Sequence, residues 1–183
     1  MTTVYLARHG ESDWNVERRW QGHADRPLTE RGREQAQTLA ERLANVALDA
    51  VYASDLRRAW ETAEAVAAPR GLEVVRLREL REVDVGSWSG FTREECAKRF
   101  PAAFARWQDG GSGWEDGESY EAMGQRIVGT IQRIAAEERK QGRARRASSR
   151  ARRRERQQLS HDDPALAGLL DDLGVTKENK RRK

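Results

Sequence analysis

Residues 4–10 read Val4-Tyr5-Leu6-Ala7-Arg8-His9-Gly10, a short apolar run that ends in an Arg-His-Gly triplet. The apolar run predicts a β-strand over residues 4–7. The triplet would then place an imidazole, a fixed positive charge and a flexible backbone amide at the carboxyl end of that strand. A histidine ring nitrogen is nucleophilic near neutral pH and an arginine fork grips phosphate oxygens, so we expect a phosphoryl group to bind here. An ordinary Arg-His pair at a strand end is the plain alternative.

Strands and helices alternate after this triplet. The predicted elements are a helix capped by Thr29 and running towards Val46, a strand over residues 48–53, a helix from Asp55 through Val66, and a strand over residues 72–77. Further helices are predicted from a Thr92–Glu95 capping box towards Trp107 and from a Ser119 cap to Ile134. This alternation predicts an α/β fold with a mostly parallel sheet flanked by helices. The crevice of such a sheet lies at the carboxyl ends of its strands, where residues 8–10 and Ser54 would both lie.

Several further segments follow in a fixed order, and through them the chain resembles the histidine phosphatase superfamily, the phosphoglycerate-mutase-like fold. The segments that carry the resemblance are Leu6–Ser12, Trp14-Asn15, Arg19-Trp20-Gln21-Gly22, Pro27-Leu28-Thr29, Gly32, Gln35-Ala36, Ala53–Ala59, Thr62-Ala63, Leu80-Arg81-Glu82, Gly86, Trp88, Gly90 and Gly117-Glu118-Ser119. The resemblance covers about residues 3–138. It implies a three-layer α/β fold and places the chain in the phosphatase branch of the family.

The resemblance also implies roles for four side chains. His9 is the nucleophile that becomes a phosphohistidine, while Arg8 and Arg58 neutralise the phosphate. Glu82 protonates the leaving alcohol and then deprotonates the water that hydrolyses the intermediate. Solvent-facing surface charge is the alternative for Arg58 and Glu82, because each lies among other charged residues.

Other positions match residues that shape the phosphate pocket in the family. With Arg8, Arg58 and Glu82, the candidates for substrate binding are Ser12, Asn15, Gln21 and Gly22, and the wider set adds Arg19, Ser54 and the amides of Glu118 and Ser119. Ordinary turn and cap chemistry is the alternative for Asn15 and Gln21. Trp14, Trp20 and Trp88 are expected to pack in the core or at its rim, and His23 to face solvent. The sequence holds no Asp/His cluster with metal-ligand spacing, so we expect neither a metal nor a cofactor.

Composition limits the classes of protein to which the chain can belong. Its 183 residues are enough for one domain with a real core. It has no membrane-length apolar run and no signal-peptide pattern, and its single cysteine, Cys96, fits a reducing compartment. We therefore expect a cytoplasmic protein without a membrane partner; homo-oligomerisation stays open.

The net charge of the chain is +4, but the charges are distributed unevenly along the sequence. Residues 139–156 hold ten Lys or Arg and one Glu, whereas residues 1–138 carry a net charge of −5. Family members have an apolar strand here that delivers a second histidine, in a Ser-His-Gly turn, to the phosphate. No apolar run occurs between Ala136 and Leu159, so that strand cannot form. Ser160-His161-Asp162 is the only substitute, and whether His161 acts as the second pocket histidine stays open.

Three explanations compete for the arginine tract. It is a tail that binds nucleic acid or an acidic partner, or the chain has diverged into a phosphate sensor, or the reading frame is shifted across GC-rich codons. No aromatic residue interleaves the tract, so base stacking is not indicated, and we favour the shifted frame. The predicted organisation is a histidine-phosphatase-like domain over residues 1–138, a disordered or aberrant segment over 139–160, and a short helix with a polar tail over 161–183.

The function predicted from the sequence is hydrolysis of a phosphomonoester, a small phosphorylated metabolite, through a phosphohistidine. Loss of the second pocket histidine would impair it. A phosphoglycerate-mutase-type phosphotransferase is one alternative, and a catalytically weak phosphate-binding or nucleic-acid-associated protein is the other. The sequence does not identify the substrate.

Overall fold

The computed structural model describes residues 2–162, with side chains for residues 2–144 and 147–152. The described chain separates into two compact units, one of residues 4–133 and one of residues 134 onward with residues 2 and 3. The predicted short helix and tail from residue 163 onward lie outside the described residues. Every candidate site residue except His161 belongs to the first unit, and the side chain of His161 lies outside the described ones.

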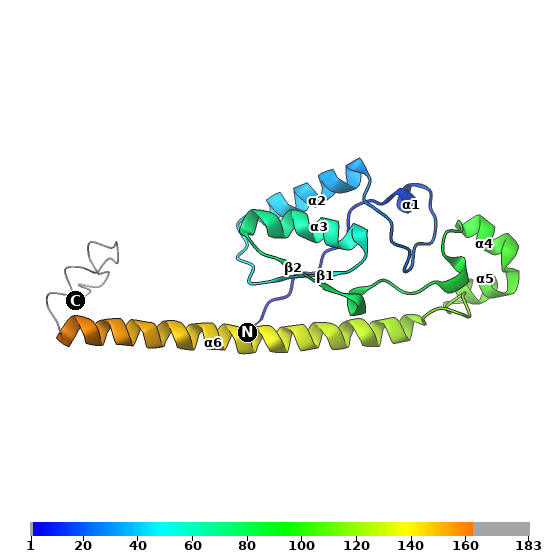
Figure 1. The fold of residues 1–183 in the computed structure, drawn as a ribbon. Helices are drawn as coiled ribbons and strands as arrows, with labels where there is room; N and C mark the ends of the chain where they lie inside the picture. Colours follow the sequence, from blue (N-terminus) through cyan, green and yellow to red (C-terminus); the bar gives the residue numbers. More distant parts are fainter. Residues whose placement is uncertain (1, 163–183) are drawn as a thin grey trace. The chain divides into compact units, whose positions relative to one another are not determined.

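A parallel sheet flanked by helices forms the centre of the first unit (Figure 1). Strand β1 (Val51–Ser54) pairs with β2 (Val74–Leu77) in a register that sets Val51 opposite Val74 and Ser54 opposite Leu77. Parallel strands need a long crossover connection. Helix α3 (Arg57–Ala67), continued by the 3₁₀ turn η1 (Ala68–Arg70), supplies it, and α2 (Glu30–Arg42) packs on α3. The α/β fold class and both of these strands were predicted from the sequence and are confirmed.

Three helix starts follow from side-chain caps. The Thr29 hydroxyl accepts the Gly32 N–H at 3.0 Å at the start of α2. Thr92 and Glu95 form the predicted capping box of α4 (Arg93–Arg99). The Ser119 hydroxyl accepts the Ala122 N–H at 3.1 Å, and α6 begins at the next residue, running over Tyr120–Asp162. A cap that satisfies a free N–H fixes where a helix begins, which is why these predictions are confirmed.

Two helix boundaries differ from the prediction. Helix α3 begins at Arg57 rather than at Asp55, because the backbone of Leu56 is extended, with a ψ of 135°. Both carboxylate oxygens of Asp55 bind Arg81, at 2.6 and 2.5 Å. The helix predicted to run to Trp107 is split into α4 and α5 (Pro101–Gln108), because Pro101 lacks an N–H and restricts the residue before it. The remaining short elements are α1 (Asp13–Val16), η2 (Arg78–Leu80) and η3 (Gly86–Trp88).

The strand predicted over residues 4–7 is not formed. These residues belong to neither β1 nor β2, and Val4, Tyr5 and Leu6 are 46%, 57% and 79% exposed. An apolar run becomes a strand only when a neighbouring strand pairs with it, because isolated backbone N–H and C=O groups gain nothing from extension. Within residues 2–162 the segment has no such neighbour. The sequence analysis anticipated the loss of a partner strand but not this consequence for residues 4–7.

Residues 139–160 are helical, whereas the sequence analysis expected a disordered or aberrant segment. They continue α6, which runs without a break to Asp162. Arginine, alanine, glutamine and glutamate are good helix formers, and no proline interrupts them. No helix in the described part of the chain is both long and apolar enough to cross a membrane.

A cluster of aromatic side chains forms a second core in the first unit, separate from the sheet. Trp88 is fully buried and stands edge-on to Trp20 and Trp114, with ring centroids 5.6 and 5.7 Å apart. Trp20 and Trp88 therefore pack in the core, as predicted. Cys96 lies in the same cluster, and burial raises the pKa of its thiol to about 11, so this thiol stays protonated near neutral pH.

Two glycines let the Arg-His-Gly turn approach helix α2 closely. A Cβ on Gly10 would lie 2.2 Å from the Gly32 carbonyl oxygen, and one on Gly32 would lie 2.0 Å from the Glu11 carbonyl oxygen. The contact is locked by hydrogen bonds from the Glu11 N–H to Gln35 Oε1 at 2.8 Å and from the Thr29 N–H to the Glu11 carbonyl at 2.9 Å. The position of His9 is thus set by the first turns of α2.

Substituting two helical glycines should change stability in opposite directions. Gly32→Ala has to move backbone atoms, so we expect a loss of about 1–3 kcal/mol in the free energy of unfolding in spite of alanine's helix propensity. Gly124, in α6, has open space around it, so Gly124→Ala should gain up to about 1 kcal/mol. Urea unfolding measures both. A Gly32→Ala chain as stable as wild type would contradict the close approach.

Supplying the missing partner strand should order residues 4–7. We expect a chain in which an apolar strand ending in Ser-His-Gly replaces residues 139–157 to show at least roughly tenfold slower amide exchange at residues 4–7, because a paired strand protects its N–H groups. A polar segment of the same length is the control. Equal exchange in the two chains would show that residues 4–7 do not depend on that neighbour.

Candidate active site

The two ring nitrogens of His9 are held in different ways. Nδ1 lies 2.6 Å from the Gly10 carbonyl oxygen, which can only accept a hydrogen bond, so Nδ1 carries the proton. Nε2 lies 3.2 Å from Arg58 Nε, which can only donate, so Nε2 presents its lone pair. The geometry therefore selects one neutral tautomer, in which the Nε2 lone pair accepts the Arg58 N–H.

Arg58 is a buried cation in the first turn of α3. It is 2% exposed, and its Nη1 and Nη2 donate to the carbonyl oxygens of Ala24 at 2.8 Å and Gly22 at 2.9 Å. Gly22 has a φ of +48° and packs so tightly that a Cβ would lie 2.7 Å from a Val85 methyl group. Three of the five guanidinium N–H groups are thus donated within the described part of the chain, and the other two are left for an anion. Surface charge, the alternative considered for Arg58, is wrong.

Thr62, one turn after Arg58 in α3, links Arg58 to Gly10, the residue that follows His9. Its hydroxyl donates to the Arg58 carbonyl at 2.8 Å and accepts the Gly10 N–H at 3.1 Å. Burial lowers the pKa of His9, and the charges of Arg58 and Arg8 lower it further, against the Gly10 hydrogen bond and the charge of Glu82. His9 is therefore neutral at neutral pH, the state that a nucleophile requires.

Arg8 is exposed beside a hollow of about 320 Å³ next to His9. The hollow lies between the Arg-His-Gly segment and the helices α2 and α3. It is lined by Leu6, Ala7, Arg8, His9, Gly10, Gln35, Ala36, Leu39 and Thr62. Arg8 is the one fixed charge in this lining, and neither Arg58 nor Glu82 contributes to it.

Glu82 is exposed, and its Oε1 accepts the N–H of Val83 at 3.0 Å. Its negative charge acts on both His9 and Arg58, raising the pKa of each against the effect of burial. The structure thus brings His9, Arg58, Arg8 and Glu82 into one electrostatic neighbourhood. Their chemical roles stay predictions.

Three predicted substrate-binding side chains bind one another. The Ser12 hydroxyl is fully buried and lies 2.9 Å from Asn15 Oδ1 and 2.7 Å from Gln21 Oε1. Ser12 also caps α1, and the Asn15 side chain accepts the Ser12 N–H at 3.0 Å. Cap and turn chemistry, the alternative considered for Asn15 and Gln21, therefore describes what these side chains do in the structure.

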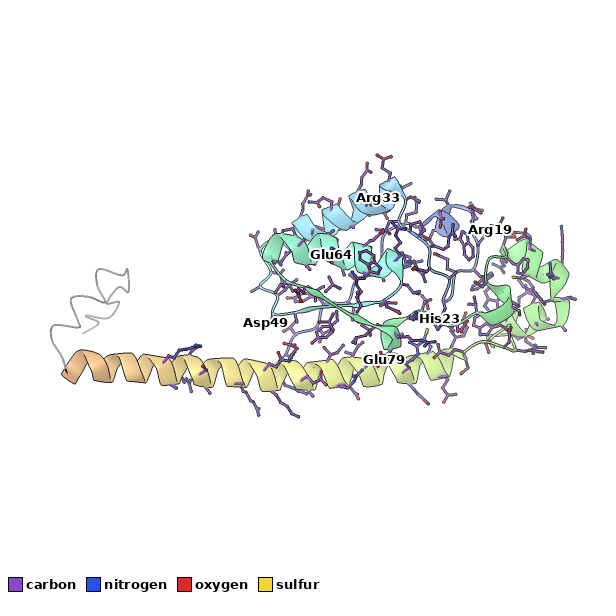
Figure 2. The ribbon with its side chains drawn as sticks, in the orientation of Figure 1. Arg19, His23, Arg33, Asp49, Glu64 and Glu79 are labelled. Carbon is purple, nitrogen blue, oxygen red and sulfur yellow. The ribbon has the colours of Figure 1, made fainter. Side chains whose placement is uncertain are left out.

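The wider set of predicted pocket residues makes other contacts. Arg19 lies beside α4, where its Nη1 donates to Glu95 Oε2 at 3.0 Å and to the Gly90 carbonyl at 2.7 Å (Figure 2). Ser54 is buried at the end of β1 and accepts the Leu56 N–H at 3.2 Å. None of these contacts involves His9.

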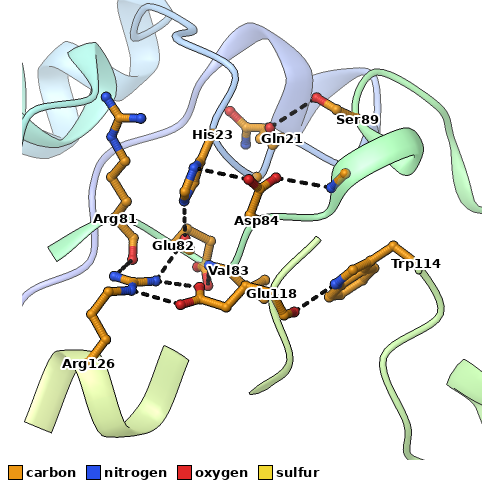
Figure 3. A network of polar contacts seen from close by, with 12 residues as sticks. Gln21, His23, Arg81, Glu82, Val83, Asp84, Ser89, Trp114, Glu118 and Arg126 are labelled. Atoms are coloured by element: carbon orange, nitrogen blue, oxygen red, sulfur yellow. Dashed lines mark hydrogen bonds and ion pairs between the residues drawn. The ribbon is translucent and has the colours of Figure 1, made fainter. Parts of the chain in front are cut away.

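Two side chains that the sequence analysis did not assign to the site hold the Glu82 segment (Figure 3). His23 is 25% exposed, and its Nε2 donates to the Glu82 carbonyl at 3.0 Å while its Nδ1 lies 3.4 Å from Asp84 Oδ2. His23 is therefore partly exposed, and in addition it holds the Glu82 segment, which the sequence did not predict. Arg126 reaches the same carbonyl from α6 and pairs with Glu118. His23 directly follows Gly22, and this adjacency was the one signal that placed it near the site.

Within residues 2–162 whose side chains are described, no group of three or more His, Cys, Asp or Glu side chains is arranged to hold a metal ion.

The chain is similar to several known proteins. The chain is 42% identical over 107 residues to phosphoserine phosphatase 1 of Hydrogenobacter thermophilus, which covers 58% of this chain and 51% of that protein. It is 47% identical over 103 residues to phosphoglycerate mutase-like protein 4 of Arabidopsis thaliana, covering 55% and 45%. The solved structure of the alpha-ribazole phosphatase from Shigella flexneri matches with a TM-score of 0.67 at 34% identity, covering 72% of this chain and 66% of that one.

The chain spans about half the length of these curated relatives. The family model for the histidine phosphatase superfamily (branch 1) matches residues 4–157, and so extends into the arginine tract, beyond the residue 138 at which the resemblance was expected to end. Because that match covers most of the sequence, the chain belongs to the histidine phosphatase superfamily.

Proposed function

We propose that this chain is a metal-independent phosphomonoester hydrolase that acts on a small phosphorylated metabolite through a phosphohistidine at His9. The observation that carries the proposal is the fixed tautomer of His9, with Nδ1 bound to the Gly10 carbonyl at 2.6 Å and Nε2 facing Arg58 at 3.2 Å. A neutral imidazole with an oriented lone pair beside a buried cation is what a nucleophile for a phosphate needs.

The reaction proceeds in two displacements. In the first, the Arg58 Nε–H turns from His9 to a phosphate oxygen and frees the Nε2 lone pair, which attacks phosphorus. The bond from phosphorus to the leaving oxygen breaks, and the Glu82 carboxyl gives that oxygen its proton. In the second, the Glu82 carboxylate takes a proton from water, whose oxygen attacks phosphorus and breaks the P–N bond. Inorganic phosphate leaves and the Nε2 lone pair returns. Arg58 and Arg8 neutralise the phosphate oxygens in both steps.

The proposed surroundings of the enzyme follow from the same chemistry. Its partner is a small phosphorylated metabolite rather than a membrane or a nucleic acid, and its location is the cytoplasm. Relatives named as phosphoserine and alpha-ribazole phosphatases support a phosphate monoester of a small molecule as substrate.

A mutase is the second candidate, favoured by the 47% identity to a phosphoglycerate mutase-like protein. A mutase passes the phosphoryl group from histidine back to an alcohol, whereas a phosphatase passes it to water. Release of inorganic phosphate from a monoester in a simple buffer, against transfer to an added alcohol, distinguishes the two.

Substitutions of Glu82 and Arg58 should separate proton donation from charge stabilisation. An alkyl phosphate needs a proton on its leaving oxygen and an activated aryl phosphate does not, so Glu82→Gln should slow the alkyl phosphate by about 10²–10⁴-fold and the aryl phosphate far less. Arg58→Ala should slow both by about 10²–10³-fold. Steady-state kcat/KM for the two substrates measures this.

Neighbouring residues supply the matched controls. Arg57 is adjacent to Arg58 but 54% exposed and paired with Glu61, so Arg57→Ala should leave both rates near wild type. Glu79→Gln removes an exposed carboxylate close to Glu82 in sequence. Equal losses on both substrates in Glu82→Gln would contradict its role as the acid, and a fully active Arg58→Ala chain would contradict the proposed phosphate site.

A further inference from the structure

The guanidinium of Arg126 has a partner for each of its five N–H groups, all within the first compact unit. Nε and Nη2 bind the two carboxylate oxygens of Glu118 at 2.8 and 2.5 Å. Nη1 donates to the carbonyl oxygens of Glu79 at 2.7 Å and Arg81 at 2.9 Å, and Nη2 points its other N–H at the Glu82 carbonyl, 3.5 Å away. A planar fork of this kind fixes several acceptors at once, which a lysine cannot do.

Arg126 contacts the carbonyl groups of residues 79, 81 and 82, in a segment that connects β2 to the second core. A second side chain contacts this segment as well. His23 donates to the same Glu82 carbonyl at 3.0 Å, as Figure 3 shows. The main chain beyond it is fixed because the Glu118 N–H donates to the Asp84 carbonyl at 2.8 Å. The backbone of Glu82 is therefore clamped between α6 and the loop that follows Gln21.

The carboxylate of Glu82 is not part of that clamp. It is exposed and accepts the Val83 N–H, and its charge acts on His9 and Arg58 as well as on Arg126. An anchored main chain serves a proton donor, because a donor has to stay within hydrogen-bond reach of the leaving oxygen.

We propose that Arg126 is a positioning residue that holds Glu82 for proton transfer, an inference that rests on the proposed function of Glu82. Arg126 touches neither substrate nor the reacting atoms. It acts by binding the carbonyl groups of residues 79, 81 and 82, while Glu118 fixes the orientation of its guanidinium. The Glu118 amide, which the resemblance assigned to the phosphate pocket, donates instead to the Asp84 carbonyl at 2.8 Å.

The kinetic test compares Arg126→Met with Arg133→Met. Arg133 lies on the same helix and pairs with Glu79 at 3.4 Å, both side chains being about half exposed, so it is the matched control. Arg126→Met should lose at least tenfold more activity on an alkyl phosphate than on an activated aryl phosphate, as Glu82→Gln does, whereas Arg133→Met should lose little on either. The double variant Arg126→Met/Glu82→Gln should be no slower on the alkyl phosphate than Glu82→Gln alone. Equal losses on both substrates, or additive losses in the double variant, would overturn the proposal.

Amide exchange at Val83 gives a second readout that needs no turnover, because its N–H binds the Glu82 carboxylate. We expect at least tenfold faster exchange in Arg126→Met and no change in Arg133→Met. Arg126→Lys, which keeps the charge but not the fork, serves if Arg126→Met fails to fold, and should show the same acceleration. Unchanged exchange at Val83 overturns the positioning role. Accelerated exchange in a chain that shows no His9-dependent hydrolysis would instead overturn the proposed function and leave the clamp on Glu82 standing.

Discussion

The burial of the Arg58 guanidinium is the constraint on which the site depends. A buried cation without partners is strongly destabilising, so the fold has to bring acceptors to it. Those acceptors are the carbonyl oxygens of Gly22 and Ala24 and the Nε2 lone pair of His9. The buried guanidinium therefore joins three segments, which are the start of α3, the loop after Gln21 and the Arg-His-Gly triplet. Burial lowers the pKa of Arg58, and the negative charge of Glu82 opposes this shift. Arg58 is thus coupled electrostatically to the residue proposed as the acid.

A second constraint keeps the nucleophile in place. Gly10 and Gly32 bring two backbones closer than any side chain would allow, and Thr62 bonds both Gly10 and Arg58. His9 is thus held from α2 and from α3. The exposed residues 4–6 just before it are by contrast held by no strand. Within the described part of the chain the nucleophile is ordered by helices and backbone packing, not by the sheet.

Sequence patterns predicted most of what local chemistry determines. Thr29, Thr92 and Ser119 marked three helix starts because a capping hydrogen bond needs only neighbouring residues. The strand over residues 4–7 was predicted wrongly because a strand depends on a neighbour that the local pattern cannot supply. The helix over residues 139–160 was missed because a run of like charges predicts a solvated, disordered segment, whereas arginine, alanine and glutamine have high helix propensity. Arg8 and His9 were predicted from the Arg-His-Gly triplet, and Arg58 and Glu82 from the family resemblance. His23 and Arg126 were missed because their contacts join segments far apart in sequence.

The central claim is that the Nε2 atom of His9 carries the phosphoryl group. Rapid quenching of the full chain with a phosphomonoester, followed by mass mapping and separation of the two phosphohistidine isomers, tests it most directly. The account predicts a single label on His9, attached at Nε2, labile in acid and stable in base, and absent from His9→Ala. A label at Nδ1, a label on another residue, or full labelling of His9→Ala would contradict the tautomer that Gly10 and Arg58 impose.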